Sequence, residues 1–572
     1  DEALAARILI EAPSVQGRYA FSHALIRQTL YEELNPTRRA RYHKRVAEAL
    51  TTKGGLPAEL ALHFTAAHEP DRALFHSLAA ARAAEEVLAI AEAARHYDHA
   101  LELWDEVAAP EATTGIDRPE LLRRAAEVTY LVDGGLARAI SLAREAESSI
   151  DAESNPVRAG VVAERLGVYS QMAGQGTEAV AAFERAIALT PADPPSPERA
   201  RALAGLAGML MLLSRYRESE ERSLEAIRVA RDVGDRTSEC HALVTLGTVE
   251  GLTGRVEDGK AHILEGREIA LQERAVNEAL RSYANLSTIL DEAGRLEEAV
   301  ADALEGSEQA ARWHVYGKHY WFPRGNAAYS LSRLGRWDEA EKILETGQAQ
   351  PEGVSAVYLL SMSAYLAAIR GRLEEARTHL KDVFSKSSDI LEPQFQGPIH
   401  WIAAMTAHFS GRSEEAWKYI EAGLDWTEKG EDWFYRAPLH SLGAAILADL
   451  ALADEGQPQH LQALGVLVRG MQSADSGPRA ADFPAQLAQT EAEMLRGEGR
   501  SSPSSWGKAA ALWEEVGEPY PTAYCRFRQG EALIATGERD QGNELLDQAA
   551  GVAARLGAAP LAQMIETIRK AA

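Results

Sequence analysis

Charged residues recur three and four places apart along this chain, with Ala and Leu between them, which is the pattern of helices that have one solvated face. Residues 79–101 show it well, because they consist almost wholly of good helix formers. β-Branched residues are sparse and aromatic residues make up only 7% of the chain. The pattern therefore predicts an all-α protein.

A turn-plus-helix phrase recurs through most of the sequence. Its cleanest copies are GRLEEA at 294–299, GRWDEA at 335–340, GRLEEA at 371–376 and GRSEEA at 411–416. With weaker copies included, the phrases start at 134, 174, 214, 254, 294, 335, 371 and 411, so the steps are 40, 40, 40, 40, 41, 36 and 40 residues. Looser copies lie near Gly456, Gly499 and Gly537, and the same step taken backwards reaches Ala94, inside a helical pair at 57–108. This period predicts about a dozen helical hairpins.

Each phrase has a mechanical explanation: Gly ends one helix in the left-handed conformation, and the acidic residues after it favour the start of the next helix. Around Gly174, residues stand at the spacings of the tetratricopeptide pattern: Leu166, Gly167, Ala179, Phe183, Ala186 and Pro191. The small residues would let paired helices approach closely, and Phe183 and Ala186 would face the neighbouring hairpin. The array resembles tetratricopeptide repeats with units of about 40 residues, and it predicts a right-handed α-solenoid over residues 53–572.

Length and charge narrow the classes of function. A chain of 572 residues is too long for one hydrophobic core, which suits an array of repeats. The net charge of -25 would repel phosphate backbones, so we expect no nucleic-acid contact by the repeats. Two cysteines, Cys240 and Cys525, fit a reducing cytoplasm, and no apolar run is long enough to suggest a membrane span.

The first 52 residues do not fit the repeat. FSHALIRQTLYEEL followed by RRARYHKRVAEAL resembles the end of the winged-helix subdomain that closes the AAA-type ATPase module of large bacterial STAND regulators of the LuxR type. Residues 510–561 are similar to the last repeats of the same regulators, ahead of their DNA-binding domain. The chain also begins without Met, in mid-pattern, so we expect a piece of a larger protein.

The resemblance implies a sensor region that belongs to a switch. A protein or small-molecule effector would bind in the superhelical groove, and the repeats would contact their own ATPase module in a parent protein that can oligomerise. No cofactor is expected in this piece, whereas the ATPase of the parent would bind ATP or ADP with Mg. Two alternatives stay open: a constitutive protein-interaction scaffold, and the regulatory tail of a multidomain nucleotide cyclase. In none of these is the piece itself an enzyme.

The resemblance also implies roles for residues near the N-terminus. His23 stands where STAND proteins often carry a winged-helix histidine that contacts the β-phosphate of ADP. A helix-packing histidine without a ligand is the alternative. The next helix carries the basic run Arg38, Arg39, Arg41, Lys44 and Arg45. This run would dock on the ATPase or on phosphate, or it is simply a solvated helix face.

Catalytic and metal-binding motifs are weak. Gly254, Gly259 and Lys260 match part of a P-loop, but Ala261 replaces the Ser or Thr that binds magnesium, and the string lies on the turn of the repeat. His314 and His319 are five residues apart, so they do not share a helix face as metal ligands would. We therefore expect neither a catalytic site nor a metal site.

Aromatic residues mark the part of the array that is most suited to binding. Residues 313–435 hold 19 of the 38 aromatic residues and seven of the ten tryptophans. Large aromatics beside arginines are typical of interfaces and ligand pockets. The candidates are Trp313, Tyr316, Tyr320, Trp321 and Arg324 in one stretch, and Trp433, Tyr435 and Arg436 in another. Ordinary packing of these side chains is the alternative.

Overall fold

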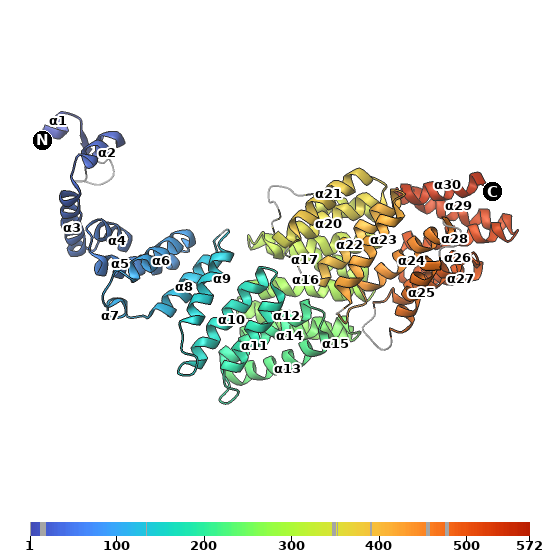
Figure 1. Cartoon of the computed structure of the whole chain (residues 1–572), viewed down its shortest axis with the longest axis horizontal. Coiled ribbons are helices and arrows are strands. Elements are labelled where there is room, and N and C mark those ends of the chain that lie inside the picture. The colour runs from blue at the N-terminus through green and yellow to red at the C-terminus, as the bar shows by residue number, and fades with distance from the viewer. Residues whose placement is uncertain are drawn as a thin grey trace. The chain divides into compact units, whose positions relative to one another are not determined.

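The structure is a computed structural model, and it describes residues 2–11, 19–132, 134–345, 351, 353–388, 390, 392–428, 430–453, 458–474 and 480–571. The chain divides into two compact units, Asp1–Tyr169 and Ser170–Ala572. Figure 1 follows the helices in chain order from the blue N-terminus to the red C-terminus. The predicted all-α fold of tetratricopeptide-like helical hairpins is confirmed.

Unit 1 opens with a small antiparallel pair of strands, β1 (Leu9–Glu11) and β2 (Tyr19–Phe21), in which Ile10 lies opposite Ala20. Its helices are α1 (Glu2–Ala5), α2 (Ala24–Glu32), α3 (Pro36–Lys53), α4 (Pro57–Ala66), α5 (Pro70–Glu86), α6 (Ile90–Trp104), α7 (Pro110–Thr114), α8 (Arg118–Tyr130) and α9 (Leu136–Ser148), followed by most of α10 (Pro156–Met172). The predicted boundary at 52/53 falls at the last turn of α3. The winged-helix assignment of residues 1–52 stays a prediction.

Unit 2 consists of paired helices throughout its described residues. They are α11 (Gly176–Leu189), α12 (Pro197–Leu212), α13 (Tyr216–Val233), α14 (Arg236–Leu252), α15 (Val256–Gln272), α16 (Val276–Glu292), α17 (Leu296–Arg312), α18 (Lys318–Arg333), α19 (Trp337–Leu344), α20 (Gly353–Ile369), α21 (Leu373–Lys386), α22 (Pro393–Phe409), α23 (Ser413–Thr427), α24 (Arg436–Ala453), α25 (Pro458–Gln472), α26 (Phe483–Gly497), α27 (Pro503–Val516), α28 (Pro519–Ala535), α29 (Arg539–Leu556) and α30 (Ala559–Ala571).

The turns of the hairpins lie where the repeat places them. The first residue of all eight predicted phrases is left-handed, with φ between 55° and 92°: Gly134, Gly174, Ser214, Gly254, Gly294, Gly335, Gly371 and Gly411. Gly499 and Gly537 are left-handed as well, whereas Gly456 lies outside the described residues. The backward step reaches Ala94 inside α6, within the expected helical pair, and the left-handed turn residue before that helix is Leu88, with φ of 58°. The longer α6–α8 connection, which includes α7, shifts the register there.

In the clean copies of the phrase, the second helix begins without a capping side chain. Arg295 and Arg336 occupy the N-cap positions of α17 and α19, and neither accepts a hydrogen bond there. Instead, Arg295 pairs with Glu298 at 2.6 Å and Arg336 pairs with Glu339 at 2.6 Å. The glutamates also lie in the first turn, where the helix dipole favours negative charge.

Small residues allow the two helices of a hairpin to touch. A side chain at Gly247 in α14 would overlap the backbone carbonyl of Gly259 in α15, and the reverse holds for Gly259. Gly530 and Gly542 make the same contact between α28 and α29. The prediction that Phe183 faces the neighbouring hairpin is confirmed, because its ring lies against Gly205 of α12.

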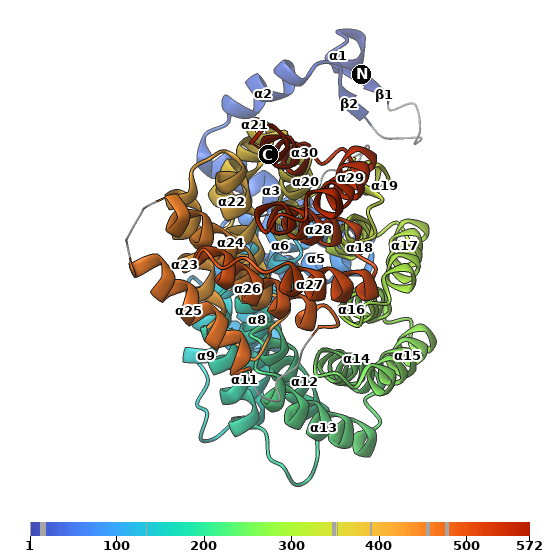
Figure 2. The ribbon, with the colours of Figure 1, turned by 90° about the vertical axis from the view of Figure 1, so that its right-hand side faces the viewer.

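Late helices of unit 2 pack onto early turns of the same unit. The backbone N–H of Glu431 donates to the carbonyl of Ser214 at 2.9 Å, and that of Ala481 donates to the carbonyl of Glu292 at 2.8 Å. One hydrophobic core combines Leu331 and Leu366 with Phe527, Leu561 and Ile565. Figure 2 shows α28 beside α18, in line with these contacts. We call this contact zone the coil seam.

Candidate functional site

The first helices of successive hairpins form a continuous row in unit 2. Each packs against the next first helix along the chain, in the order α12, α14, α16, α18, α20, α22 and α24. Side chains that point away from the second helices line this row, and we call the resulting surface the inner-helix face. Because it collects side chains from several repeats, it is the natural place for an extended ligand.

A charged group occupies the inner-helix face at α14, α16 and α18. Glu278 lies 3.1 Å from the ring of His241 and 3.1 Å from the guanidinium of Arg281. Arg281 also donates to the carbonyl oxygen of His241 at 2.7 Å. Lys318 and His319 follow at the start of α18. We call these five residues the charged tier.

The surroundings of the charged tier alter its titration. Burial alone would raise the pKa of the Glu278 carboxyl, but His241 and Arg281 hold that pKa well below its usual range. Loss of solvent lowers the pKa of the Lys318 ammonium, although much of the side chain is exposed. Burial, followed by the charge of Lys318, lowers the pKa of His319 to about 4, so its ring is neutral at pH 7.

An aromatic group continues the same face on α18, α20 and α22. The ring of Phe322 stacks on Tyr358 at 5.5 Å between centroids and approaches Phe395 at 6.1 Å. Tyr358 lies over Gly325, where any side chain would overlap its ring. The Tyr358 hydroxyl donates to Asn326 Oδ1 at 2.8 Å. We call Phe322, Tyr358 and Phe395 the aromatic tier.

The aromatic stretch at 313–324 mostly serves packing. Trp321 is 2% exposed and lies in the core, and partly buried Trp313 packs against the cluster around Leu243. The Arg324 guanidinium donates to the carbonyl of Ile343 in α19 at 2.5 Å, with Tyr320 beside it. Tyr316 is 47% exposed and touches the ring of Tyr320. Trp321 and Arg324 therefore lie on the side of α18 that faces its own hairpin. Trp313 packs at the end of α17, and Tyr316 lies in the connection before α18.

The second stretch lies at the coil seam. Trp433 packs edge-on against Phe483 at 5.5 Å, and the Arg436 guanidinium lies 5.0 Å from the centre of the Trp433 ring. Tyr435 lies beside Gly397 of α22, and burial raises the pKa of its hydroxyl well above the usual value. These three side chains join α24 to its neighbours, which is a structural role.

Residues of the inner-helix face that are not among the candidates from the sequence share a register. Arg281 and Phe322 each stand thirteen places before the turn glycine of their repeat, Gly294 or Gly335. Asn285 and Asn326 each stand nine places before it. Counting back from the turn would have identified which residues lie on the inner-helix face. The density of aromatic residues identified only the stretch of sequence that contains them.

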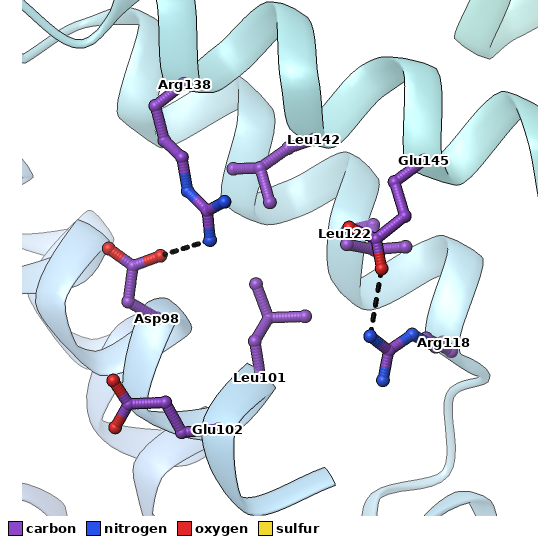
Figure 3. Close-up of a pocket in the computed structure, with 8 residues that line it drawn as sticks. All are labelled: Asp98, Leu101, Glu102, Arg118, Leu122, Arg138, Leu142 and Glu145. Carbon is purple, nitrogen blue, oxygen red and sulfur yellow. Dashed lines mark hydrogen bonds and ion pairs between the residues drawn. The ribbon is translucent and has the colours of Figure 1, made fainter. Parts of the chain in front are cut away.

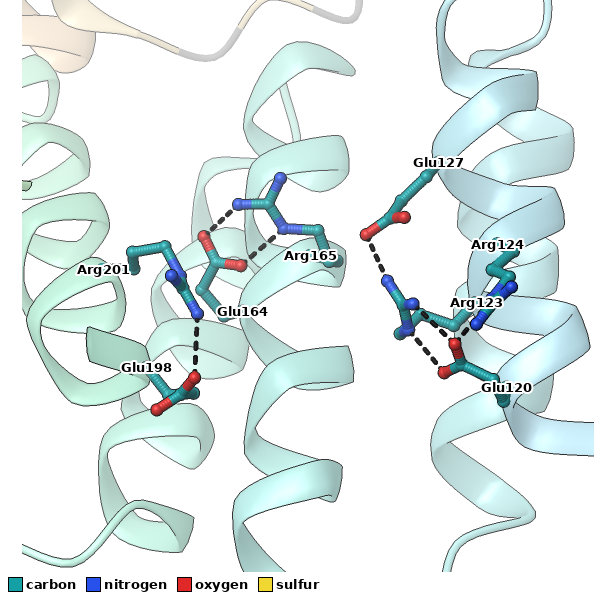
Figure 4. Close-up of polar contacts among 8 residues, drawn as sticks. All are labelled: Glu120, Arg123, Arg124, Glu127, Glu164, Arg165, Glu198 and Arg201. Atoms are coloured by element: carbon teal, nitrogen blue, oxygen red, sulfur yellow. Dashed lines mark hydrogen bonds and ion pairs between the residues drawn. The ribbon is translucent and has the colours of Figure 1, made fainter. Parts of the chain in front are cut away.

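On the first helices of earlier hairpins, arginines pair with glutamates of the same helix (Figure 4). In unit 1, Arg123 of α8 contacts Glu120 at 2.8 Å and Glu127 at 2.5 Å, and Arg165 of α10 pairs with Glu164 at 2.6 Å. In unit 2, Arg201 of α12 pairs with Glu198 at 3.2 Å. These cations are therefore compensated by neighbours on their own helices.

Unit 1 also contains a cavity of about 460 Å³ between α6, α8 and α9 (Figure 3). Arg138 pairs with Asp98 at 3.3 Å on one side, and Arg118 pairs with Glu145 at 2.9 Å on the other. Its lining residues are Asp98, Leu101, Glu102, Arg118, Leu122, Arg138, Leu142 and Glu145. The size suits a small ligand, but three carboxylates face two arginines that are already paired, so the cavity disfavours anions.

His23 serves as a helix cap in this structure. Its Nδ1 accepts a hydrogen bond from the backbone N–H of Leu25 at 3.2 Å, at the start of α2. In the basic run, Lys44 pairs with Glu69, and Arg39 lies over the ring of Tyr31 at 4.7 Å. The role of His23 in nucleotide sensing stays a prediction.

The partial P-loop match is a repeat turn. Gly254 is left-handed, Gly259 packs on Gly247, and Lys260 pairs with Glu298 at 3.3 Å. Within the described ranges, His, Cys, Asp and Glu form no group of three or more that could hold a metal ion. In the same part of the chain, no helix has both the length and the apolar character needed to cross a membrane.

Comparisons with known proteins add little beyond the fold. No protein-family model matches the chain, and no curated protein matches it. Among solved structures, apo RapI is 12% identical, with a TM-score of 0.33 over 54% of this chain and 98% of RapI. The apo form of the quorum sensor NprR from B. thuringiensis is 12% identical, with a TM-score of 0.36 over 68% of this chain and 97% of NprR. At these scores the similarity carries no argument about function.

Proposed function

We propose that this chain is the effector-binding repeat domain of a STAND-type ATP-dependent regulator in the cytoplasm, and that the effector binds on the inner-helix face of unit 2. The observation that carries the proposal is the charged tier beside the aromatic tier, on first helices of consecutive hairpins. Such a surface offers both charge recognition and apolar contact to one extended ligand.

The coil seam supplies a route from binding to regulation. The helices that carry the inner-helix face also carry seam residues, since α16 and α18 end at Glu292 and Arg333. A ligand that changes the spacing of these helices would bias the packing of α26 and α28 on them. In the parent regulator this shift would favour either a closed ADP state or an open ATP state of the ATPase module.

The binding site is tested with two single variants. Peptide-display and metabolite libraries are screened against the purified chain, and ligands are retested on Phe322→Ala and Tyr316→Ala. We expect Phe322→Ala to weaken binding about tenfold or more, because it removes the centre of the aromatic tier. Tyr316→Ala should bind as the wild type, because Tyr316 precedes α18 and contacts the ring of Tyr320, which is not part of the aromatic tier. The reverse result would move the site to the surroundings of Tyr316 and reject the inner-helix face.

The regulatory context is tested by the domains that the same gene encodes on either side of this segment. The proposal requires that the gene also encodes a P-loop ATPase before this segment and a DNA-binding domain after it. A cyclase domain in front would favour the regulatory tail of a cyclase instead. A gene with neither ATPase nor DNA-binding domain would reject the STAND assignment while leaving the binding site open to the first test.

A further inference from the structure

Lys318 differs from the other cations of the first helices described above. Within the described residues, no carboxylate lies at ion-pair distance from its ammonium, and its one polar contact is the sulfur of Met172 at 3.7 Å. By contrast, Arg201 and Arg281 each pair with a glutamate on their own helix. The Lys318 side chain reaches the surface although its ammonium has lost part of its solvent, so a ligand that brings a negative charge can pair with it.

The local charge balance around Lys318 is positive. Within the charged tier, Lys318 and Arg281 contribute two positive charges and Glu278 contributes one negative charge. His319 is neutral at pH 7 and His241 adds no negative charge, so the sum is at least +1. The whole chain carries -25. A positive site within such an acidic protein attracts an anionic group that the rest of the surface repels.

Apolar contact is available next to this charge. Phe322 stands one helical turn after Lys318 on α18, and its ring continues into Tyr358 and Phe395. Residues four apart lie on the same face of a helix, so the ammonium and the ring point to the same side. A ligand that extends along the row meets the charge first and the aromatic rings second.

We propose that the inner-helix face binds a short peptide that carries a carboxylate, and that Lys318 pairs with this carboxylate while Phe322 contacts an adjacent apolar side chain. This inference rests on the proposed function and specifies its ligand class. Arg281 takes no part in this pairing, because Glu278 and the carbonyl of His241 already hold its guanidinium.

The test uses synthetic octapeptides on an array. Each is acetylated and amidated, contains Ala, Leu and Phe, and carries one Glu at a varied position. A twin carries Gln at that position, and a third version carries Gln together with a free C-terminal carboxylate. Comparison of the three versions separates a side-chain carboxylate from a terminal one as the recognised group.

We expect the wild-type chain to bind one of the two carboxylate-bearing versions about fivefold to tenfold more tightly than the amidated Gln twin. This is the gain in affinity that one charge-assisted hydrogen bond provides. Lys318→Met should abolish this preference, and Lys318→Arg should retain it. Lys342→Met makes the same chemical change at an exposed lysine of α19 and should preserve the preference. Raising the salt concentration should reduce the preference, because exposed charges are screened.

Each outcome decides between the two proposals. Equal binding of all three peptide versions by the wild type would overturn carboxylate recognition, and so would a preference that survives Lys318→Met. If Phe322→Ala still weakened binding in that case, the inner-helix face would remain the effector site. An array on which no peptide binds would reject a peptide ligand, while metabolite binding would still be judged by the Phe322 and Tyr316 variants.

Discussion

Left-handed residues set the hairpin turns, and most of them are glycines. The non-glycine residues with positive φ in the described ranges are Arg7, His68, Leu88, Ser214, Arg274 and His314. A side chain in this conformation crowds its own backbone, which costs about 1–2 kcal/mol. Leu88 is the clearest case, because its side chain is 80% exposed and gains little from burial.

We predict that Leu88→Gly raises the free energy of unfolding of unit 1 by about 0.5–1 kcal/mol, since the relief of backbone strain exceeds the added entropy of the unfolded chain. Urea denaturation followed by circular dichroism measures this change. Leu131→Gly is the matched control: Leu131 is 62% exposed at the end of α8, but its φ is -85°. The control should be neutral or destabilised, and a gain of equal size in both variants would contradict the explanation.

At the candidate site, residues next to each other in the sequence lie on opposite sides of α18. Sequence reasoning selected Trp321 and Arg324 from a stretch that also contains Lys318 and Phe322. Each residue along a helix is rotated by about 100° from the one before it, so Trp321 enters the core while Phe322 faces outward. Aromatic content could locate this stretch, but only the packing of α18 against α17 and α19 determines which side is free.

At the scale of the element, the hairpin depends on the close crossing of its helices. The spacing of small residues around each turn is visible in the sequence, and the structure shows the contact that requires it at Gly247 and Gly259. Helix propensity alone would favour Ala at both positions. Their glycines are therefore explained by packing and not by local conformation.

We predict that Gly259→Ala destabilises the α14–α15 hairpin by about 1–3 kcal/mol, because its Cβ would overlap the carbonyl of Gly247 and approach the backbone nitrogen of Gly251 to 2.7 Å. Gly551→Ala makes the same substitution in α29, where a Cβ has open space. The control should gain up to about 1 kcal/mol from helix propensity. Thermal unfolding and hydrogen exchange in α14 and α15 compare the two, and equal effects would count against the crossing argument.

At the scale of the whole molecule, the coil seam buries charge. Arg333 of α18 contacts Asp291 at 2.6 Å, Glu518 at 2.7 Å and Asp482 at 3.5 Å. Three carboxylates thus share one guanidinium in a buried site. Burial, partly offset by Arg333, raises the pKa of Glu518 to about 7, and burial also raises the pKa of Asp482.

These shifts predict that unit 2 loses stability as the pH rises. The folded-state pKa of Glu518 lies above its ordinary value of 4.5, so its stabilising contribution is complete below pH 4.5 and is lost as the pH rises through about 7. We expect a loss of about 1–3 kcal/mol attributable to Glu518 between pH 5 and pH 8. Thermal melts across that range measure it.

Glu518→Gln should flatten this pH dependence, because the amide does not titrate. Glu515→Gln is the control, since Glu515 is an exposed residue of the preceding helix. The control should keep the wild-type slope. If Glu518→Gln kept that slope too, Glu518 would not be the group responsible.

The sequence by itself determined the helices, the left-handed turns and the small residues between paired helices, because each of these follows from local backbone preference or from a contact within one repeat of about 40 residues. Only the tertiary structure decided which side of α18 is free and which charges are buried. Arg333 and Glu518 are 185 residues apart and meet because successive hairpins turn the array back on itself. That rotation accumulates from the packing of every pair of neighbouring helices, and no single repeat encodes it.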